Sequence, residues 1–190
     1  MTSAPTANLQ RLAALVCLAD SYSPRGYDLT QLELQALAYL LDHSGRGPQL
    51  RWTFGEYGPS STDLEELRPG LGEYLTSEPN DWGRTVLRLR PETLPLARKM
   101  LEADTAMARR AQRVAQVIAG FEMPWGLELL AVTHWAGSLV AADAEAVLST
   151  ARALGNRPGQ PGLLEAGDVA VVLAHLQRLG WLTAGQTGTP

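Results

Sequence analysis

The chain has 190 residues, of which 45% are hydrophobic and 19% are charged. This composition is typical of a globular protein and excludes a disordered one, and the length is enough for one domain with a sizeable core or for two very small domains. The net charge of −4 and the isoelectric point of about 5.4 exclude the overall basic balance that is typical of a DNA-binding protein. No apolar run approaches the roughly 20 residues that span a bilayer, so we expect no membrane partner.

The single cysteine, Cys17, excludes a disulfide framework or a cysteine-based zinc site within the chain. It falls among apolar residues at helical spacing, so we expect a buried thiol in a reducing compartment. The N-terminus lacks a basic stretch followed by an apolar core, which is the pattern of a secretory signal. These features together predict a cytoplasmic protein.

The N-terminal region is expected to be helical after a short tail. Residues 1–8 are small and polar and predict a flexible tail. Apolar residues recur at helical spacing from Leu9, and a loop rich in turn-forming residues is expected at 21–28. Thr30 and Glu33 have the spacing of a capping box, in which each side chain satisfies a backbone N–H of the first turn. A second helix is therefore expected to start at Thr30.

The next region alternates short strands with a helix. Apolar and polar residues alternate over 50–54 and again near 84–90, which predicts two half-buried strands. Between them we expect a turn at 57–60 and a helix that opens with a second capping box at Thr62 and breaks at Pro69. Helix, strand, helix and strand in this order resemble a winged-helix core.

The remainder is helical almost throughout. The segment 126–137 is apolar nearly all round, so it predicts a central, buried helix, and Gly120 ends the helix before it. The expected fold class is mainly α with a small β-wing. A winged-helix-like part (9–104) is followed by a helical bundle (105–182) of the same compact unit and by a flexible tail (183–190).

Catalytic patterns are absent from the sequence. His43, His134 and His175 show no metal-site spacing, and His134 beside Trp135 on the buried helix predicts a hydrogen-bonded core residue. Glycine-rich phosphate loops and the GxSxG turn are missing, and Cys17 has no activating neighbour. We therefore expect no catalytic residue, no metal and no cofactor, and a protein that is not an enzyme.

A first candidate binding segment is 54–59, which holds two aromatic residues, two glycines and a proline. Trp52 and Phe54 are expected to pack in the core, whereas Tyr57 is either an interface anchor on a stiff loop or a further core residue. The acidic residues that accompany this segment either form a negative surface or stabilise a helix start through its dipole. They are Glu56, Asp63, Glu65, Glu66 and Glu73.

A second candidate segment is 120–128, where Trp125 stands between two carboxylates. It is either an exposed anchor or a turn that seats the buried helix. Basic residues gather at Arg109, Arg110 and Arg113, opposite the apolar stripe of their helix. No aromatic residue is interleaved with them, so they predict a solvated face rather than a nucleic-acid contact.

Several blocks of the sequence resemble the C-terminal domain of DarG antitoxins. The blocks are LQALAYLL (34–41), LRW (50–52), YGP (57–59) with Asp63-Leu64, GFE (120–122) with Pro124 and GLELL (126–130), His134-Trp135 and LGWL (179–182). The resemblance runs from about Leu29 to Leu182 and is more specific in the block 120–130. The chain departs from the family at Ser60, where an aromatic residue usually follows Gly-Pro, and at Pro69, where the family continues a helix.

The resemblance implies a role in a toxin–antitoxin system. In this family the toxin, DarT, transfers ADP-ribose from NAD onto thymidine in single-stranded DNA. A macrodomain of DarG removes the modification, and the C-terminal domain binds the toxin and blocks its DNA site. Only the second part is similar to this chain, so no hydrolase activity is carried over. The implied partner is a DarT-type toxin, with a macrodomain either in the full-length protein or encoded separately.

The expected mechanism is masking of the toxin's DNA site, with carboxylates in place of phosphates and aromatic side chains as anchors. The expected toxin-binding residues are Glu56, Tyr57, Asp63, Glu65, Glu66, Glu122, Trp125 and Glu128. Nucleic acid is not an expected partner. The alternatives are a winged-helix DNA-binding transcriptional regulator, which requires a basic stripe on one face, and a scaffold domain with an unrelated protein partner.

Overall fold

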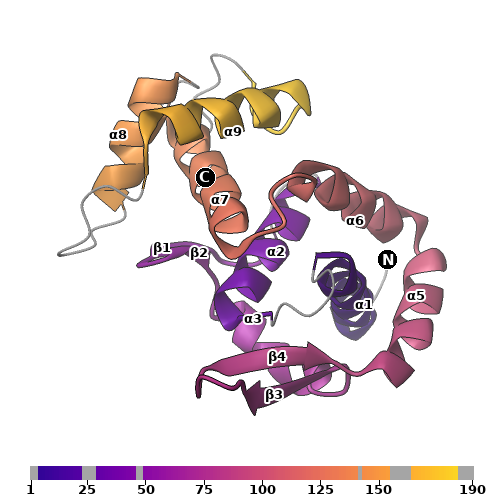
Figure 1. Ribbon diagram of the computed structural model, residues 1–190. Helices are drawn as coiled ribbons and strands as arrows, with labels where there is room; N and C mark the ends of the chain where they lie inside the picture. Colours follow the sequence, from indigo (N-terminus) through magenta and orange to yellow (C-terminus); the bar gives the residue numbers. More distant parts are fainter. Residues whose placement is uncertain (1–3, 23–28, 46–48, 141–142, 155–163, 184–190) are drawn as a thin grey trace.

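The computed structural model describes residues 4–22, 29–45, 49–140, 143–154 and 164–183. Within these residues it contains nine α-helices and two two-stranded antiparallel sheets, which confirms the expected mainly α fold with a small β part (Figure 1). The elements are α1 (Ala4–Tyr22), α2 (Gln31–His43), β1 (Thr53–Gly55), β2 (Gly58–Ser60), α3 (Asp63–Glu66), α4 (Arg68–Leu71), β3 (Leu75–Pro79), β4 (Thr85–Leu89), η1 (Pro91–Thr93), α5 (Leu94–Glu102), α6 (Thr105–Ile118), α7 (Pro124–Leu139), α8 (Ala144–Leu154) and α9 (Ala166–Arg178).

Helix α1 lies inside a ring formed by α2, α5, α6 and the β3–β4 hairpin (Figure 1). Ala14, Leu15 and Val16 are 0% exposed, since elements surround the helix on several sides. The small side chain of Ala14 lets a neighbouring element approach closely. The helix begins at Ala4 and not at Leu9, so it replaces most of the expected tail at 1–8. A proline in the first turn is compatible with this early start, since the N–H that it lacks has no helical partner there.

Two other expectations about the first 30 residues turn out differently. Cys17 is half-buried and not fully buried, and partial burial raises the pKa of its thiol, which disfavours the reactive thiolate. Of the expected loop at 21–28, Ser21 and Tyr22 belong to α1, and the rest lies outside the described residues. The tail expected at 183–190 also lies outside them, apart from its first residue.

The β1–β2 hairpin replaces the expected strand and turn between residues 50 and 60. Thr53 pairs with Ser60 and Gly55 with Gly58, so residues predicted as a turn form the second strand. Gly58 has a φ of 109°, a conformation that glycine adopts without strain. This conformation lets the chain reverse direction between β1 and β2. The strand predicted over residues 50–54 is therefore wrong at its start, because β1 begins only at Thr53.

The β3–β4 hairpin confirms the predicted strand near 84–90 and supplies an unpredicted partner for it. Leu75 pairs with Leu89, so the chain after Leu71 forms a strand where no strand was predicted. The chain between residues 62 and 71 forms two four-residue helices, and Thr62 makes no capping hydrogen bond. A Cβ on Gly70 would lie 2.6 Å from Cδ1 of Leu12, so this glycine lets α4 lie close against α1.

Helix α7 packs against α2, α8 and α9 and links the two parts of the molecule (Figure 1). Leu127, Leu130 and Ala136 are 0% exposed, which confirms the prediction of a central, buried helix. Helix α6, which precedes α7 in the chain, packs on α1, and a single cluster of buried apolar side chains includes residues from before and after residue 104.

The carboxylate of Asp42, near the end of α2, is 1% exposed and joins four segments. Its Oδ2 accepts hydrogen bonds from the backbone N–H groups of Gln49 and Leu50 and from Nε1 of Trp52, each at 2.9 Å. Its Oδ1 lies 3.7 Å from Nη2 of Arg11 on α1 and 3.7 Å from Nη2 of Arg110 on α6. This group therefore holds α1, α2, α6 and the segment before β1 together.

Replacing Asp42 with alanine should lower the free energy of unfolding by about 3–5 kcal/mol, because it leaves two guanidinium groups and three N–H donors without their buried partner. Asp20→Ala is the matched control, since Asp20 pairs with Arg98 at the surface and its loss should cost less than about 1 kcal/mol. Urea unfolding measures both changes. Equal losses in the two variants would show that Asp42 has no special structural role.

Candidate functional site

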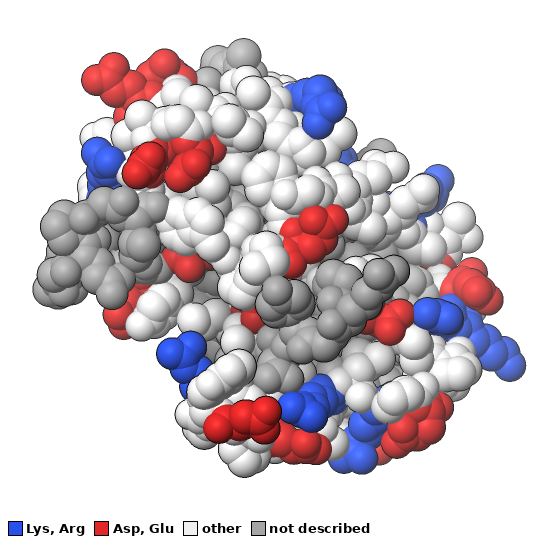
Figure 2. Space-filling view, viewed as in Figure 1, with Lys and Arg blue, Asp and Glu red and all other residues white. Residues whose placement is uncertain are grey.

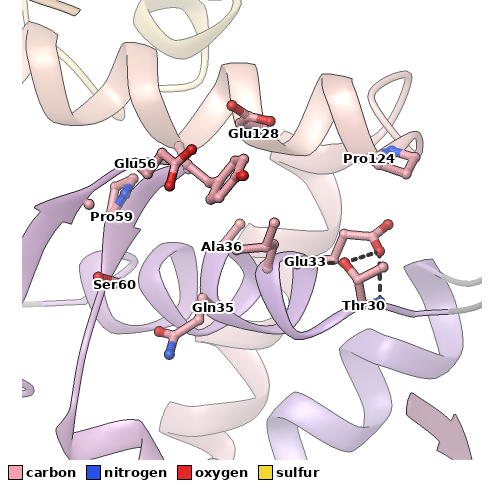
Figure 3. Close-up of a pocket in the computed structure, with 14 residues that line it drawn as sticks. Thr30, Glu33, Gln35, Ala36, Glu56, Pro59, Ser60, Pro124 and Glu128 are labelled. Atoms are coloured by element: carbon pink, nitrogen blue, oxygen red, sulfur yellow. Dashed lines mark hydrogen bonds between the residues drawn. The ribbon is translucent and has the colours of Figure 1, made fainter. Parts of the chain in front are cut away.

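A pocket of about 320 Å³ lies between α2, the β1–β2 hairpin and the start of α7. Figure 3 shows it as an elongated space, with Glu56 and Pro59 at the hairpin end and Thr30 with Glu33 at the other. Its described lining residues include three carboxylates and no lysine or arginine. The pocket brings together three residues of the expected toxin-binding set, namely Glu56, Tyr57 and Glu128.

Glu33 is the third carboxylate of the pocket, and the sequence analysis treated it only as a cap. The capping box is confirmed, since Oε2 accepts from the Thr30 N–H at 2.8 Å and the Thr30 hydroxyl accepts from the Glu33 N–H at 3.3 Å. Its Oε1 accepts from the hydroxyl of Tyr22 at 2.6 Å. Because these bonds fix Glu33 at 5% exposure, its carboxylate is a rigid part of the wall.

The acidic residues of α3 lie outside this pocket. Asp63 is bound by Arg51, whose backbone N–H donates to Oδ2 at 2.8 Å, and this pairing lowers the pKa of the carboxyl. Glu65 accepts from Nε2 of Gln31 at 3.0 Å, and both Glu65 and Glu66 are exposed. Asp63 is therefore held in an ion pair within the chain, and Glu65 and Glu66 lie at the exposed surface.

The turn before α7 places Glu122 and Trp125 differently. Glu122 is exposed, and its Oε2 accepts from the N–H of Gly120, whose φ of 88° reverses the chain. Trp125 is half-buried and packs against the core, so it supports the helix more than it presents an open anchor. A Cβ on Gly126 would lie 2.9 Å from the backbone oxygen of Phe121, so the turn closes tightly at this glycine.

The two helices that flank the pocket are joined by a buried hydrogen bond. The hydroxyl of Tyr39 on α2 lies 2.7 Å from Nδ1 of His134 on α7, and His134 is 6% exposed, which confirms the predicted core histidine. Burial lowers the pKa of His134 to about 3, and repulsion from nearby His43 adds to the effect. The imidazole is therefore neutral at physiological pH.

The basic residues of α6 are less solvated than expected. Only Arg109 is exposed. Arg110 donates to the carbonyl oxygens of Leu41 at 2.7 Å and Asp42 at 2.9 Å, and Arg113 donates to that of Gly180 at 2.7 Å. Arg110 and Arg113 therefore join helices together and do not form the basic stripe that a DNA-binding regulator would require.

One exposed aromatic residue was missed. Trp82 at the tip of the β3–β4 hairpin is 83% exposed, and the Asn80 side chain fixes the turn by accepting from the N–H groups of Trp82 and Arg84. Both hairpins project toward the same side in Figure 1, and Tyr57 in the turn of the other is 47% exposed. The asparagine and glycine on either side of Trp82 are typical of a tight turn, and this was the available sequence signal for an aromatic residue at an exposed hairpin tip.

The charges on the surface are mixed. Figure 2 shows acidic and basic side chains interspersed over the displayed face, so the carboxylates there form separate groups. Among the described residues, no group of three or more histidine, cysteine or acidic side chains is arranged to hold a metal ion. None of the helices in the described ranges combines the length and apolar character that a membrane span requires.

No family model matches the chain. The sequence is 36% identical over 125 residues to a DNA ADP-ribosyl glycohydrolase of Thermus aquaticus, and the match covers 65% of this chain and 35% of the relative. It is 32% identical over 131 residues to proteins of the same name from Mycobacterium tuberculosis and Mycobacterium bovis, over 65% of this chain and 37% of each relative. The chain is therefore related to the DNA ADP-ribosyl glycohydrolases, the DarG proteins.

These relatives correct one expectation. The absence of catalytic motifs led us to expect a protein that is not an enzyme, whereas all three relatives carry the name of an enzyme. The chain spans a little over a third of their length. The relation to DarG proteins also does not favour the alternative of a DNA-binding transcriptional regulator.

Gly126→Ala should lower the free energy of unfolding by about 1–3 kcal/mol, because the added Cβ would meet backbone atoms of Phe121 that cannot move aside. Gly167→Ala on α9 is the matched control. No atom lies within 4 Å of a Cβ at that position, so this change should be neutral or stabilise by up to about 1 kcal/mol. Thermal unfolding of the two variants compares them directly, and destabilisation by both would contradict the close contact.

Stability should fall as the pH is lowered below 6.5, the ordinary pKa of histidine, toward the folded pKa of His134 of about 3. In this range His134 is protonated in the unfolded chain and stays neutral in the folded protein. The free energy of unfolding therefore falls by about 1.4 kcal/mol for each unit of pH. His134→Gln cannot titrate, so its unfolding free energy should vary less between pH 6.5 and 4. Measurements at pH 8, where the histidine is neutral in both states, give the baseline cost of the substitution.

Proposed function

We propose that this chain is the toxin-binding module of a DarT–DarG type antitoxin, which binds a DarT-type toxin and covers its single-stranded DNA site. The observation that carries the proposal is the acidic pocket with Tyr57 at its rim, in a chain that is related to DarG proteins. An enzyme that modifies single-stranded DNA requires a basic channel for the strand. Carboxylates on a rigid surface can occupy such a channel in place of phosphates.

The expected acidic residues contribute unequally to this role. Glu56 and Glu128 line the pocket, and Glu65, Glu66 and Glu122 provide further negative charge on α3 and before α7. Asp63 contributes less, because its charge is already paired with Arg51. A surface of this kind accelerates association with a basic partner and makes binding sensitive to salt.

Aromatic side chains on the two hairpins provide the apolar part of the contact. Tyr57 is 47% exposed and Trp82 is 83% exposed, and each stands on a turn that hydrogen bonds or glycine geometry hold in place. Exposed tyrosine and tryptophan side chains on rigid supports lose little conformational entropy on binding and often provide most of the interface energy. Trp125, which is half-buried, has a supporting role.

The first experiment is co-purification of the chain with a DarT-type toxin, followed by an assay for ADP-ribosylation of single-stranded DNA by the complex. We expect a stable complex in which the DNA stays unmodified. Absence of a complex between the wild-type proteins would overturn the proposed function.

Charge reversal tests the imitation of phosphates by carboxylates. The triple variant Glu65→Lys, Glu66→Lys, Glu122→Lys should weaken toxin binding at least about tenfold, because like charges would then face each other across the interface. The control Glu92→Lys, Glu145→Lys, Glu165→Lys changes the net charge equally at exposed positions on other elements and should have little effect. Equal affinities of the two variants, measured by calorimetry at two salt concentrations, would refute imitation by these residues.

A further inference from the structure

The pocket between α2, the β1–β2 hairpin and α7 has features that general charge attraction does not require. It is a defined space of about 320 Å³, at the lower end of the range for ligand pockets. A volume of this size suits one long side chain or a small molecule. Tyr57, one of its lining residues, is 47% exposed, so a group carried by another protein can reach the pocket from the side of this residue.

The charge of the pocket selects a cation. Glu33, Glu56 and Glu128 come from α2, the hairpin and α7, and no lysine or arginine is among the described lining residues. Glu33 is 5% exposed, so its charge acts in a region with little water to screen it. Figure 3 shows the three carboxylates spread along the pocket, with Glu56 at one end, Glu128 beside the middle and Glu33 at the other end. An elongated cation matches this spread better than a compact one.

The walls of the pocket suit a hydrocarbon chain that ends in a flat charged group. Ala36 and Ala131 contribute small apolar surfaces from the two helices, and Pro59 and Leu32 add larger ones. Such walls accommodate the methylene groups of a long basic side chain. The ring of Tyr57 and the carboxylates offer the two contacts that a guanidinium group makes best, which are stacking on an aromatic face and paired hydrogen bonds to a carboxylate.

From these observations we propose that the pocket binds a single arginine side chain of the protein partner. This inference rests on the proposed function and adds to it the chemical group that the partner inserts. The arginine enters past Tyr57, its methylene groups lie against the alanines, and its guanidinium pairs with the carboxylates of Glu56 and Glu128. Glu33 lies at the end of the pocket opposite Glu56 and supplies fixed negative charge.

The double variant Glu56→Gln, Glu128→Gln keeps the shape of the pocket and removes two of its charges. We expect it to bind a DarT-type toxin at least about tenfold more weakly than the wild type does, because a desolvated charge pair is lost. The control Glu145→Gln, Glu165→Gln removes two exposed charges elsewhere and should change the affinity less than about threefold. Thermal unfolding of both variants checks that each remains folded.

The outcomes separate this inference from the proposed function. If the wild type binds the toxin and the two double variants bind it equally well, the arginine pocket is refuted while toxin binding stands. If the wild type binds no toxin, both proposals fall. A selective loss in the pocket variant supports the inference. Arginines of the toxin are then replaced by alanine one at a time. The inserted arginine is the one whose replacement weakens binding to the wild type but not to the pocket variant.

A second measurement needs no toxin. N-acetyl-arginine methylamide should shift the backbone amide resonances of Ala36, Gly58 and Ala131 in a saturable way. The citrulline analogue, which is nearly the same shape but uncharged, should not shift them. Equal shifts by the two compounds, or none by arginine, would overturn the assignment.

Discussion

The buried carboxylate of Asp42 is the interaction on which the arrangement of the helices depends. It pairs with guanidinium groups from α1 and α6, and it accepts N–H groups from the segment that leads into β1. Buried charges are stable only when partners on several sides replace the lost water. The position of α2 therefore fixes where the β1–β2 hairpin begins, and the hairpin in turn forms one end of the acidic pocket.

The opposite wall of the pocket depends on a second buried polar contact. The bond between Tyr39 and His134 joins α2 to α7 within a group of aromatic rings that includes Trp52, Trp135 and Trp181. Because the imidazole is neutral and fully enclosed, this contact does not change over the physiological pH range. The pocket thus lies between two helices that are held at a fixed separation, which is the preorganisation that a binding site requires.

The acidic side chains discussed above divide into those that are buried or ion-paired and those that lie exposed at the surface. Asp42 and Glu33 are buried and accept hydrogen bonds from internal donors, and Asp63 is paired with Arg51. Glu65 and Glu66 on α3 and Glu122 before α7 are exposed. None of the three is among the lining residues of the pocket. The net charge of −4 is therefore a poor measure of how strongly the surface attracts a basic partner, because it also counts buried and paired carboxylates. What matters is which carboxylates keep their charge available at the surface.

The sequence by itself determined the features that depend on neighbours in the chain. The capping box at Thr30 and the burial of the central helix α7 follow from residue types close together in the chain, and both were predicted. Tertiary structure alone decided whether segments without a clear helical or strand period formed a helix, a strand or a turn. Leu75 became a strand residue because Leu89 was available to pair with it, and residues 58–60 became a strand because Gly58 turned the chain back. The same holds for the pocket, since Glu33, Glu56 and Glu128 lie far apart in the sequence, and only the packing of α2, α7 and the β1–β2 hairpin against one another gathers their charges in one space.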